Sequence, residues 1–341
     1  MTSSALNNNS ANTSSATNAK FLAANESPSQ WQSYRDQVLI TPARLNELLT
    51  GPADLRPLVL DVRWQLPTSR DPFDGTDLYL AGHIPGAIYV DLDTELADPP
   101  TTEAGRHPLP SYTRLQTAAR RWGVTPDRLV VAYDTIGGMA AARLWWLLRD
   151  CGLEVRILDG GLPAWEAAGL PIEAGNMEPT PSEIKLATGH MPTIHVDEVL
   201  EFAQSGTLLD ARGGIRYRGE SEPIDLRPGH IPGAVSAPAG HDIGPDGAFL
   251  PDGELAKRFA RHHIGPLTDR TLARTEPLPE VKPAGPVGVY CGSGVTAAHE
   301  IAALAIIGVE AALYPGSYSQ WVGDPERPVE LGADPTAGVS R

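Results

Sequence analysis

The stretch Val289-Tyr290-Cys291-Gly292-Ser293-Gly294-Val295-Thr296-Ala297 is where we expect the chemistry of this chain, and the rest of the chain is interpreted as its scaffold. A short apolar run, 286–290, precedes the cysteine, and a segment rich in Ala, Leu and Ile at helical spacing, 297–307, follows it. The stretch is therefore predicted to be a loop between a strand and a helix. Main-chain N–H groups in such a glycine-rich loop can converge on one anion.

Cys291 is the predicted nucleophile of this loop. The thiolate is the reactive form of cysteine, and a helix N-terminus with nearby N–H donors lowers a thiol pKa. Gly292 and Gly294 permit the backbone angles that turn N–H groups inward, and those of Val295 and Thr296 open the helix. The alternative is a buried structural cysteine, which the position on a strand-to-helix turn disfavours.

Composition narrows the functional class. The 341 residues suffice for two domains, and a formal net charge of −15 argues against nucleic acid or an anionic membrane as partner. The two cysteines, Cys151 and Cys291, indicate no disulfide framework, so a reducing, cytoplasmic location is expected. Cys151 follows an apolar helix and is interpreted as a packing residue.

The chain repeats itself. Each half contains Asp-x-Arg after an apolar run, at Asp61 and at Asp210, and later Gly-His-Ile-Pro-Gly-Ala, at 82–87 and at 229–234. A further apolar run then ends at Asp134 in the first half and at Cys291 in the second. An internal duplication with alternating strand and helix signals predicts two α/β units, each built on a mostly parallel sheet.

The repeat sets the expected domain boundaries. Polar and proline-rich segments separate the units, and the second copy carries about ten additional residues, assigned to Gly265–Gly285. The expected division is a disordered extension at 1–30, a non-catalytic domain at 31–172, a linker at 173–192, a catalytic domain at 193–330 and a tail at 331–341. Only the second copy has a thiol in its loop, so only that copy is expected to be active.

The duplicated motifs, with a thiol only in the second loop, resemble the tandem rhodanese-type sulfurtransferases. The resemblance covers about 37–328, and the loop Cys-Gly-Ser-Gly-Val-Thr-Ala is similar to that of the 3-mercaptopyruvate sulfurtransferase branch. The thiosulfate branch is expected to place Arg and Lys where this chain has Gly292 and Ser293. The resemblance implies two rhodanese-like domains and transfer of sulfur from mercaptopyruvate or thiosulfate through a Cys291 persulfide.

The same resemblance implies further site residues. Ser293 is the nearest candidate to assist the enolate leaving group, with His83 and an upstream aspartate, Asp71 or Asp74, lying across the domain interface. His83 has a counterpart in the other copy, so a purely structural role stays open. Trp64 is expected to line the cleft, with core packing as the alternative.

Arginines are expected to hold the anionic donor. The family pattern places Arg216 on its carboxylate or sulfonate, a task that suits the guanidinium fork. A second arginine of the family falls in a segment that is shorter here, so that Arg227 or no residue fills its role. Asp210 and Arg212 are interpreted as a structural ion pair.

Other classes were weighed. A phosphatase of related fold would need an arginine at the position that Ala297 holds, and no clustered ligands indicate a metal. A non-catalytic persulfide carrier or partner-binding module is the remaining alternative. We therefore expect an enzyme without metal or organic cofactor, whose acceptor is cyanide or a thiol, thioredoxin among the candidates.

Overall fold

The computed structural model describes residues 33–66, 73–265 and 285–333. The extension expected at 1–30 and most of the insertion assigned to Gly265–Gly285 lie outside these residues, as does Asp71. Among the described residues, no helix has both the length and the apolar character needed to cross a bilayer.

The N-terminal sheet has five parallel strands in the order β1-β5-β4-β2-β3. The central strands are buried along their whole length, as expected of a sheet covered on both faces. The strands are β1 (Leu39–Ile40), β2 (Leu58–Asp61), β3 (Ile88–Tyr89), β4 (Val130–Tyr133) and β5 (Val155–Leu158).

The C-terminal sheet repeats this arrangement with four parallel strands in the order β7-β6-β8-β9. Its strands are β6 (Thr207–Asp210), β7 (Val235–Ser236), β8 (Val287–Tyr290) and β9 (Ala311–Leu313). Since β8 pairs with β6 and β9 on either side, the loop after β8 lies at the carboxyl edge of the sheet, where open α/β sheets place their ligands.

Helices connect the strands, and local sequence sets several of their ends. Thr41 caps one helix, followed by Pro at its first position, and another stops at Gly123 in the left-handed region. The helices of the N-terminal half are α2 (Tyr34–Val38), α3 (Pro42–Thr50), α4 (Gly75–Ala81), α5 (Leu92–Glu95), α6 (Tyr112–Trp122), α7 (Ala141–Asp150) and α8 (Gly161–Ala167), with a 3₁₀ turn at Ala53–Leu55. Those of the C-terminal half are α9 (Val199–Ser205), α10 (Gly214–Tyr217), α11 (Asp252–Ala260), α12 (Val295–Ile306) and α13 (Ser317–Trp321), with a 3₁₀ turn at Ala239–His241.

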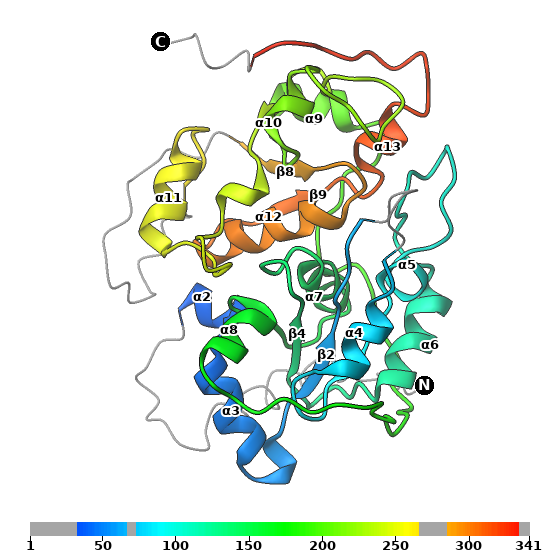
Figure 1. The fold of residues 1–341 in the computed structure, drawn as a ribbon. Helices are drawn as coiled ribbons and strands as arrows, with labels where there is room; N and C mark the ends of the chain where they lie inside the picture. The colour runs from blue at the N-terminus through cyan, green and yellow to red at the C-terminus, as the bar shows by residue number, and fades with distance from the viewer. Residues whose placement is uncertain (1–32, 67–72, 266–284, 334–341) are drawn as a thin grey trace, which may run out of the picture.

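One apolar core joins the two halves. Buried residues of α7 and α12 belong to the same cluster, and Figure 1 shows these two helices lying against each other between the sheets. Each sheet has a separate, smaller apolar cluster, without residues of α7 or α12. The domain interface is therefore a continuation of the core, and groups from both domains can meet at the loop after β8.

Candidate active site

Cys291 lies between β8 and α12, with only 3% of its surface exposed. The Gly294 N–H donates to its Sγ at 3.2 Å, and its own N–H donates to Ser317 Oγ. Gly294 has φ +83°, and a side chain there would collide with the Pro315 carbonyl oxygen. Glycine is therefore required at this turn, both by its conformation and by the close approach of main chain.

The corresponding loop of the N-terminal domain shows what such a turn binds. The carboxylate of Asp134 accepts four main-chain N–H bonds of 2.8–2.9 Å and is fully buried. The donors are Ile136, Gly138, Ala140 and Ala141. The first copy thus fills its anion cradle with its own side chain, whereas the second copy has a thiol in place of that carboxylate.

A segment of the N-terminal domain supplies a histidine to the cysteine loop. His107 Nδ1 lies 2.7 Å from Ser293 Oγ, and His107 Nε2 lies 3.2 Å from Asp93 Oδ1. Since a carboxylate only accepts, Nε2 carries the proton and the Ser293 hydroxyl donates to Nδ1. Trp64 donates from Nε1 to the same Asp93 oxygen and packs edge-on against the His107 ring.

The environment keeps this histidine neutral. Burial lowers the pKa of His107 below its ordinary value, although Asp93 acts in the opposite direction. Burial alone would raise the pKa of Asp93, but hydrogen bonds from His107 and Trp64 outweigh it and lower that pKa. The arrangement is therefore a neutral imidazole, held by an ionised carboxylate and able to take a proton from Ser293.

A buried cation connects the two domains behind the loop. Arg143 of α7 is fully buried and donates to the carbonyl oxygens of Gly294, His107 and Pro108. Burial lowers the pKa of Arg143 to about 10, and the charge of Cys291 acts against that shift. Arg143 therefore holds the histidine segment against the cysteine loop.

Arg216, predicted to bind the donor anion, lies near Gly292 of the cysteine loop. Its Nη2 bonds Glu222 Oε1 at 2.8 Å and Asp225 Oδ2 at 2.7 Å. These interactions hold the guanidinium close to Gly292. Its Nη1 lies 3.6 Å from the position that a Cβ on Gly292 would occupy. Asp210 and Arg212 form a buried ion pair of 2.6 Å, and Asp61 with Arg63 repeats it in the first domain.

Two residues expected at the site lie elsewhere. Arg227 turns toward the C-terminal segment and donates to the carbonyl oxygens of Asp324, Pro325 and Arg327. His83 is buried, stacks on Tyr79 and bonds the Tyr79 carbonyl oxygen through Nδ1. The structure brings neither of them to the cysteine loop.

The turn around His83 is repeated in the second copy. His230 stacks on Tyr217 and bonds the Tyr217 carbonyl oxygen in the same way, which fits a structural role for both histidines. Asp74 is an exposed cap of α4, bonded to the N–H of Thr76, so it does not pair with His83.

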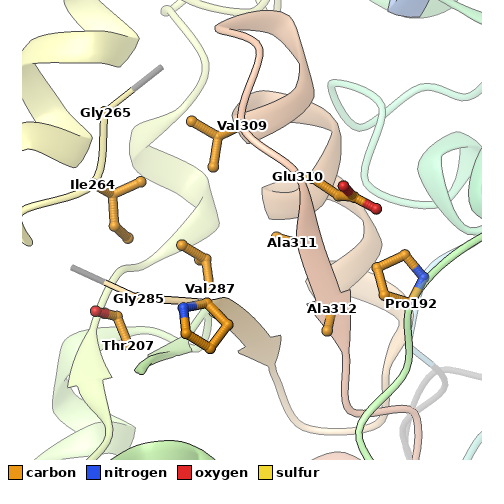
Figure 2. Close-up of a pocket in the computed structure, with 11 residues that line it drawn as sticks. Pro192, Thr207, Ile264, Gly265, Gly285, Val287, Val309, Glu310, Ala311 and Ala312 are labelled. Carbon is orange, nitrogen blue, oxygen red and sulfur yellow. The ribbon is translucent and has the colours of Figure 1, made fainter. Parts of the chain in front are cut away.

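The cavity drawn in Figure 2 is not this site. It has a volume of about 320 Å³ and lies where β6, β8 and β9 begin, bounded by Thr207, Val287 and Ala311 (Figure 2). Cys291 follows the opposite end of β8. Its lining is largely aliphatic, with Glu310 at one side, and includes no cysteine.

No local pattern in the sequence predicts that His107 contacts Ser293 of the cysteine loop. The two are joined only by tertiary structure, and Arg106-His107 belongs to neither repeated motif. The sequence signal that was available is a difference between the two copies. The segment 101–109 carries Arg and His, whereas the segment 243–250 of the second copy carries Gly, Ala and Phe. In the structure, the segment 243–250 lies against the Asp134 loop. Arg and His in the segment 101–109, without a counterpart in the segment 243–250, were therefore the sequence signal for the site at the loop after β8.

Comparison with known proteins identifies the family of this chain. Two rhodanese-fold domains that share one thiol site define the class of protein. The family model for the rhodanese-like domain matches residues 41–168 and again 195–324, and the chain belongs to the rhodanese family. This confirms the predicted family and fold class.

Relatives with similar sequences support an enzyme of one kind. SseB of Mycobacterium tuberculosis, provisionally named a thiosulfate sulfurtransferase, is 43% identical over 309 residues, covering 87% of this chain and 98% of its own. The 3-mercaptopyruvate sulfurtransferase of Escherichia coli K12 is 34% identical over 278 residues, covering 80% and 91%. The crystal structure of SseA from Escherichia coli, described as a 3-mercaptopyruvate sulfurtransferase of rhodanese fold, matches with a TM-score of 0.67 at 31% identity, covering 82% of this chain and 98% of that one. The prediction of a sulfurtransferase is confirmed.

Proposed function

We propose that this chain transfers a sulfane sulfur from 3-mercaptopyruvate or thiosulfate, through a persulfide on Cys291, to a thiol or cyanide. The observation that carries the proposal is the 2.7 Å contact between Ser293 and His107 beside the only thiol of the loop. This contact supports a proton relay next to a nucleophile, as a donor that leaves as an enolate requires.

The first half-reaction uses only the donor and the side chains of Cys291, Ser293 and His107. The Cys291 thiolate attacks the sulfur of mercaptopyruvate, the sulfur–carbon bond breaks, and its electron pair passes to the pyruvate enolate. The proton of the donor thiol passes through Ser293 and His107 to the enolate carbon, giving pyruvate and a persulfide anion. No oxidant or cofactor enters this step.

The loop is suited to the persulfide. Gly294 N–H already donates to Cys291 Sγ, and α12 begins directly after it. The four N–H bonds that the sister loop gives to Asp134 support the same role here for the N–H groups from Gly292 to Thr296. The anion is thereby stabilised without a side-chain charge in the loop itself.

Donor preference depends on the leaving group. Mercaptopyruvate needs the relay, whereas thiosulfate leaves as sulfite without a proton and needs more positive charge to offset its lost hydration. The relay favours mercaptopyruvate. Similarity to SseB and the arginine near Gly292 support thiosulfate as the second candidate.

The second half-reaction passes the outer sulfur to an acceptor. A thiolate, such as that of thioredoxin, or cyanide attacks the outer sulfur and releases the Cys291 thiolate. We place this reaction in the cytoplasm, because two unpaired thiols fit a reducing compartment.

The test compares kcat/KM for mercaptopyruvate and thiosulfate, with cyanide as acceptor, in wild type, Cys291→Ser and Cys151→Ala. Cys291→Ser is expected to abolish transfer from both donors. Cys151→Ala is the matched control, since Cys151 is a buried residue at the end of α7 and burial raises its pKa to about 12. Turnover by Cys291→Ser would refute the proposal, and wild type that forms a persulfide without turnover would favour the carrier alternative.

A companion variant tests Arg216. Removing its guanidinium deletes charge-assisted bonds to the donor, so Arg216→Ala is expected to raise the donor KM by about 10- to 100-fold. An unchanged KM would mean that another group binds the anion.

A further inference from the structure

A second guanidinium reaches the cysteine loop from the N-terminal domain. Arg106 directly precedes His107, and its main-chain N–H donates to Ser319 Oγ at 3.0 Å. Gly105 before it has φ +91°, and a Cβ there would lie 2.7 Å from the Gly316 carbonyl oxygen. The segment is therefore docked closely on the turn before α13, which fixes where the Arg106 side chain begins.

One carboxylate holds Arg106 beside Arg216. Arg106 Nη1 lies 2.8 Å from Asp225 Oδ1, and Arg216 Nη2 lies 2.7 Å from Asp225 Oδ2. The Asp225 side chain is 2% exposed, so little water screens these two contacts. The shared carboxylate therefore offsets part of the repulsion between the two cations.

Glu222 sets the position of that carboxylate. It accepts the main-chain N–H groups of Ile224 and Asp225 and also binds Arg216. The segment that carries Asp225 is therefore anchored to the same arginine that Asp225 contacts.

One nitrogen of each arginine lies close to Gly292, the residue that follows the nucleophile. A Cβ on Gly292 would lie 2.9 Å from Arg106 Nη2 and 3.6 Å from Arg216 Nη1. Neither nitrogen donates to an acceptor among the described residues. Gly292 has no left-handed φ, so its backbone conformation does not require glycine. The missing side chain instead leaves room for the two guanidinium groups.

We propose that Arg106 is the second donor-binding arginine and that Asp225 is a positioning residue holding Arg106 and Arg216 over Gly292. The proposal rests on the proposed function and names its substrate class: sulfur donors with a carboxylate or sulfonate close to the transferable sulfur. It also accounts for the neutral loop, because the positive charge absent at 292 and 293 arrives from α10 and from the other domain. Arg227, which the sequence offered for this role, is engaged elsewhere.

The test uses two donors that differ in charge. Mercaptopyruvate carries a carboxylate, whereas 1-mercaptopropan-2-one has a methyl group in its place and otherwise the same reacting atoms. Arg106→Ala is expected to raise KM for mercaptopyruvate about 10- to 100-fold with little change in kcat, and to leave kcat/KM for the neutral donor nearly unchanged. Arg106→Lys should recover part of the loss, since a point charge replaces a fork.

Two further variants separate contact from structure. Arg218→Ala removes an exposed arginine of the same segment, paired with Glu220, and should leave KM unchanged. Asp225→Ala should raise KM for mercaptopyruvate and leave KM for the neutral donor unchanged. An equal loss of kcat/KM with both donors in Arg106→Ala would overturn the proposal for Arg106, and a lower KM in Asp225→Ala would overturn the positioning role.

A binding measurement needs no turnover. Pyruvate, the desulfurated product, should protect Cys291 from alkylation by iodoacetamide, and Arg106→Ala should raise the protecting concentration about tenfold or more. An unchanged concentration overturns the inference. If wild type transfers no sulfur, the proposed function fails, while this protection still decides whether Arg106 binds the anion.

Discussion

At the scale of single residues, the proton relay depends on a histidine that stays neutral. Asp93 accepts from His107 and from Trp64, and it raises the pKa of His107 against the lowering effect of burial. Because the carboxylate favours the imidazolium, Asp93→Asn should lower the pKa of His107 further. It also removes the charge that selects the tautomer in which Nδ1 accepts from Ser293.

Titration of the His107 ring by NMR measures this directly. Wild type is expected to titrate below the ordinary histidine pKa of about 6.5, and Asp93→Asn at still lower pH. Loss of the correct tautomer should reduce kcat with mercaptopyruvate by about 10²-fold or more. A ring whose pKa rises in Asp93→Asn would contradict the assigned contacts, and His107→Gln identifies the resonance.

The residues that sequence could assign are those next to a motif. Cys291, Ser293 and Arg216 are predicted from local patterns, either the loop itself or the segment after Asp-x-Arg, and all three lie at the loop after β8. Arg106 and His107 reach the loop only because the domains pack, and local spacing carries no trace of that contact. His83 was misplaced for the opposite reason: a conspicuous local motif serves the turn that contains it.

At the scale of elements, the loops after β4 and β8 have the same architecture. Each follows a buried strand, opens toward a helix and presents main-chain N–H groups, and each lies beneath a segment of the other domain. The segment 101–109 brings Arg and His to the cysteine loop, whereas the segment 243–250 brings apolar residues and glycine to the Asp134 loop. Repetition of strands and loops was readable from the sequence; which segment covers which loop was not, because that depends on how the domains pack.

Asp134 is expected to be structural rather than catalytic. Asp134→Ala leaves four buried N–H groups without an acceptor, which should lower the free energy of unfolding by about 2–4 kcal/mol. Urea unfolding measures this loss. Below the transition kcat/KM should match wild type, and Asp134→Asn, which keeps one acceptor oxygen, should lose less stability.

At the scale of the whole molecule, groups from both domains meet at the loop that carries Cys291. The apolar core runs through α7 and α12 without interruption, so the domains are expected to unfold together. Arg143 adds polar specificity to this contact, because its bonds to His107, Pro108 and Gly294 set the histidine segment against the cysteine loop. A buried cation with only carbonyl partners is costly to desolvate, and the nearby sulfur anion offsets part of that cost.

Arg143→Met therefore tests whether the interface positions the chemistry as well as the fold. Truncation leaves several carbonyl groups unpaired and should lower the free energy of unfolding by about 2–4 kcal/mol in urea. The stronger expectation concerns the enzyme at low temperature, where the variant is folded. There kcat with mercaptopyruvate should fall while KM changes little. KM is expected to hold because donor binding depends on Arg216 and Arg106 rather than on the relay. Arg149→Met, on the same helix, is the control and should keep wild-type kcat. If Arg143→Met lost stability but kept kcat, the domain contact would serve folding alone, and His107 would reach Ser293 without help from α7.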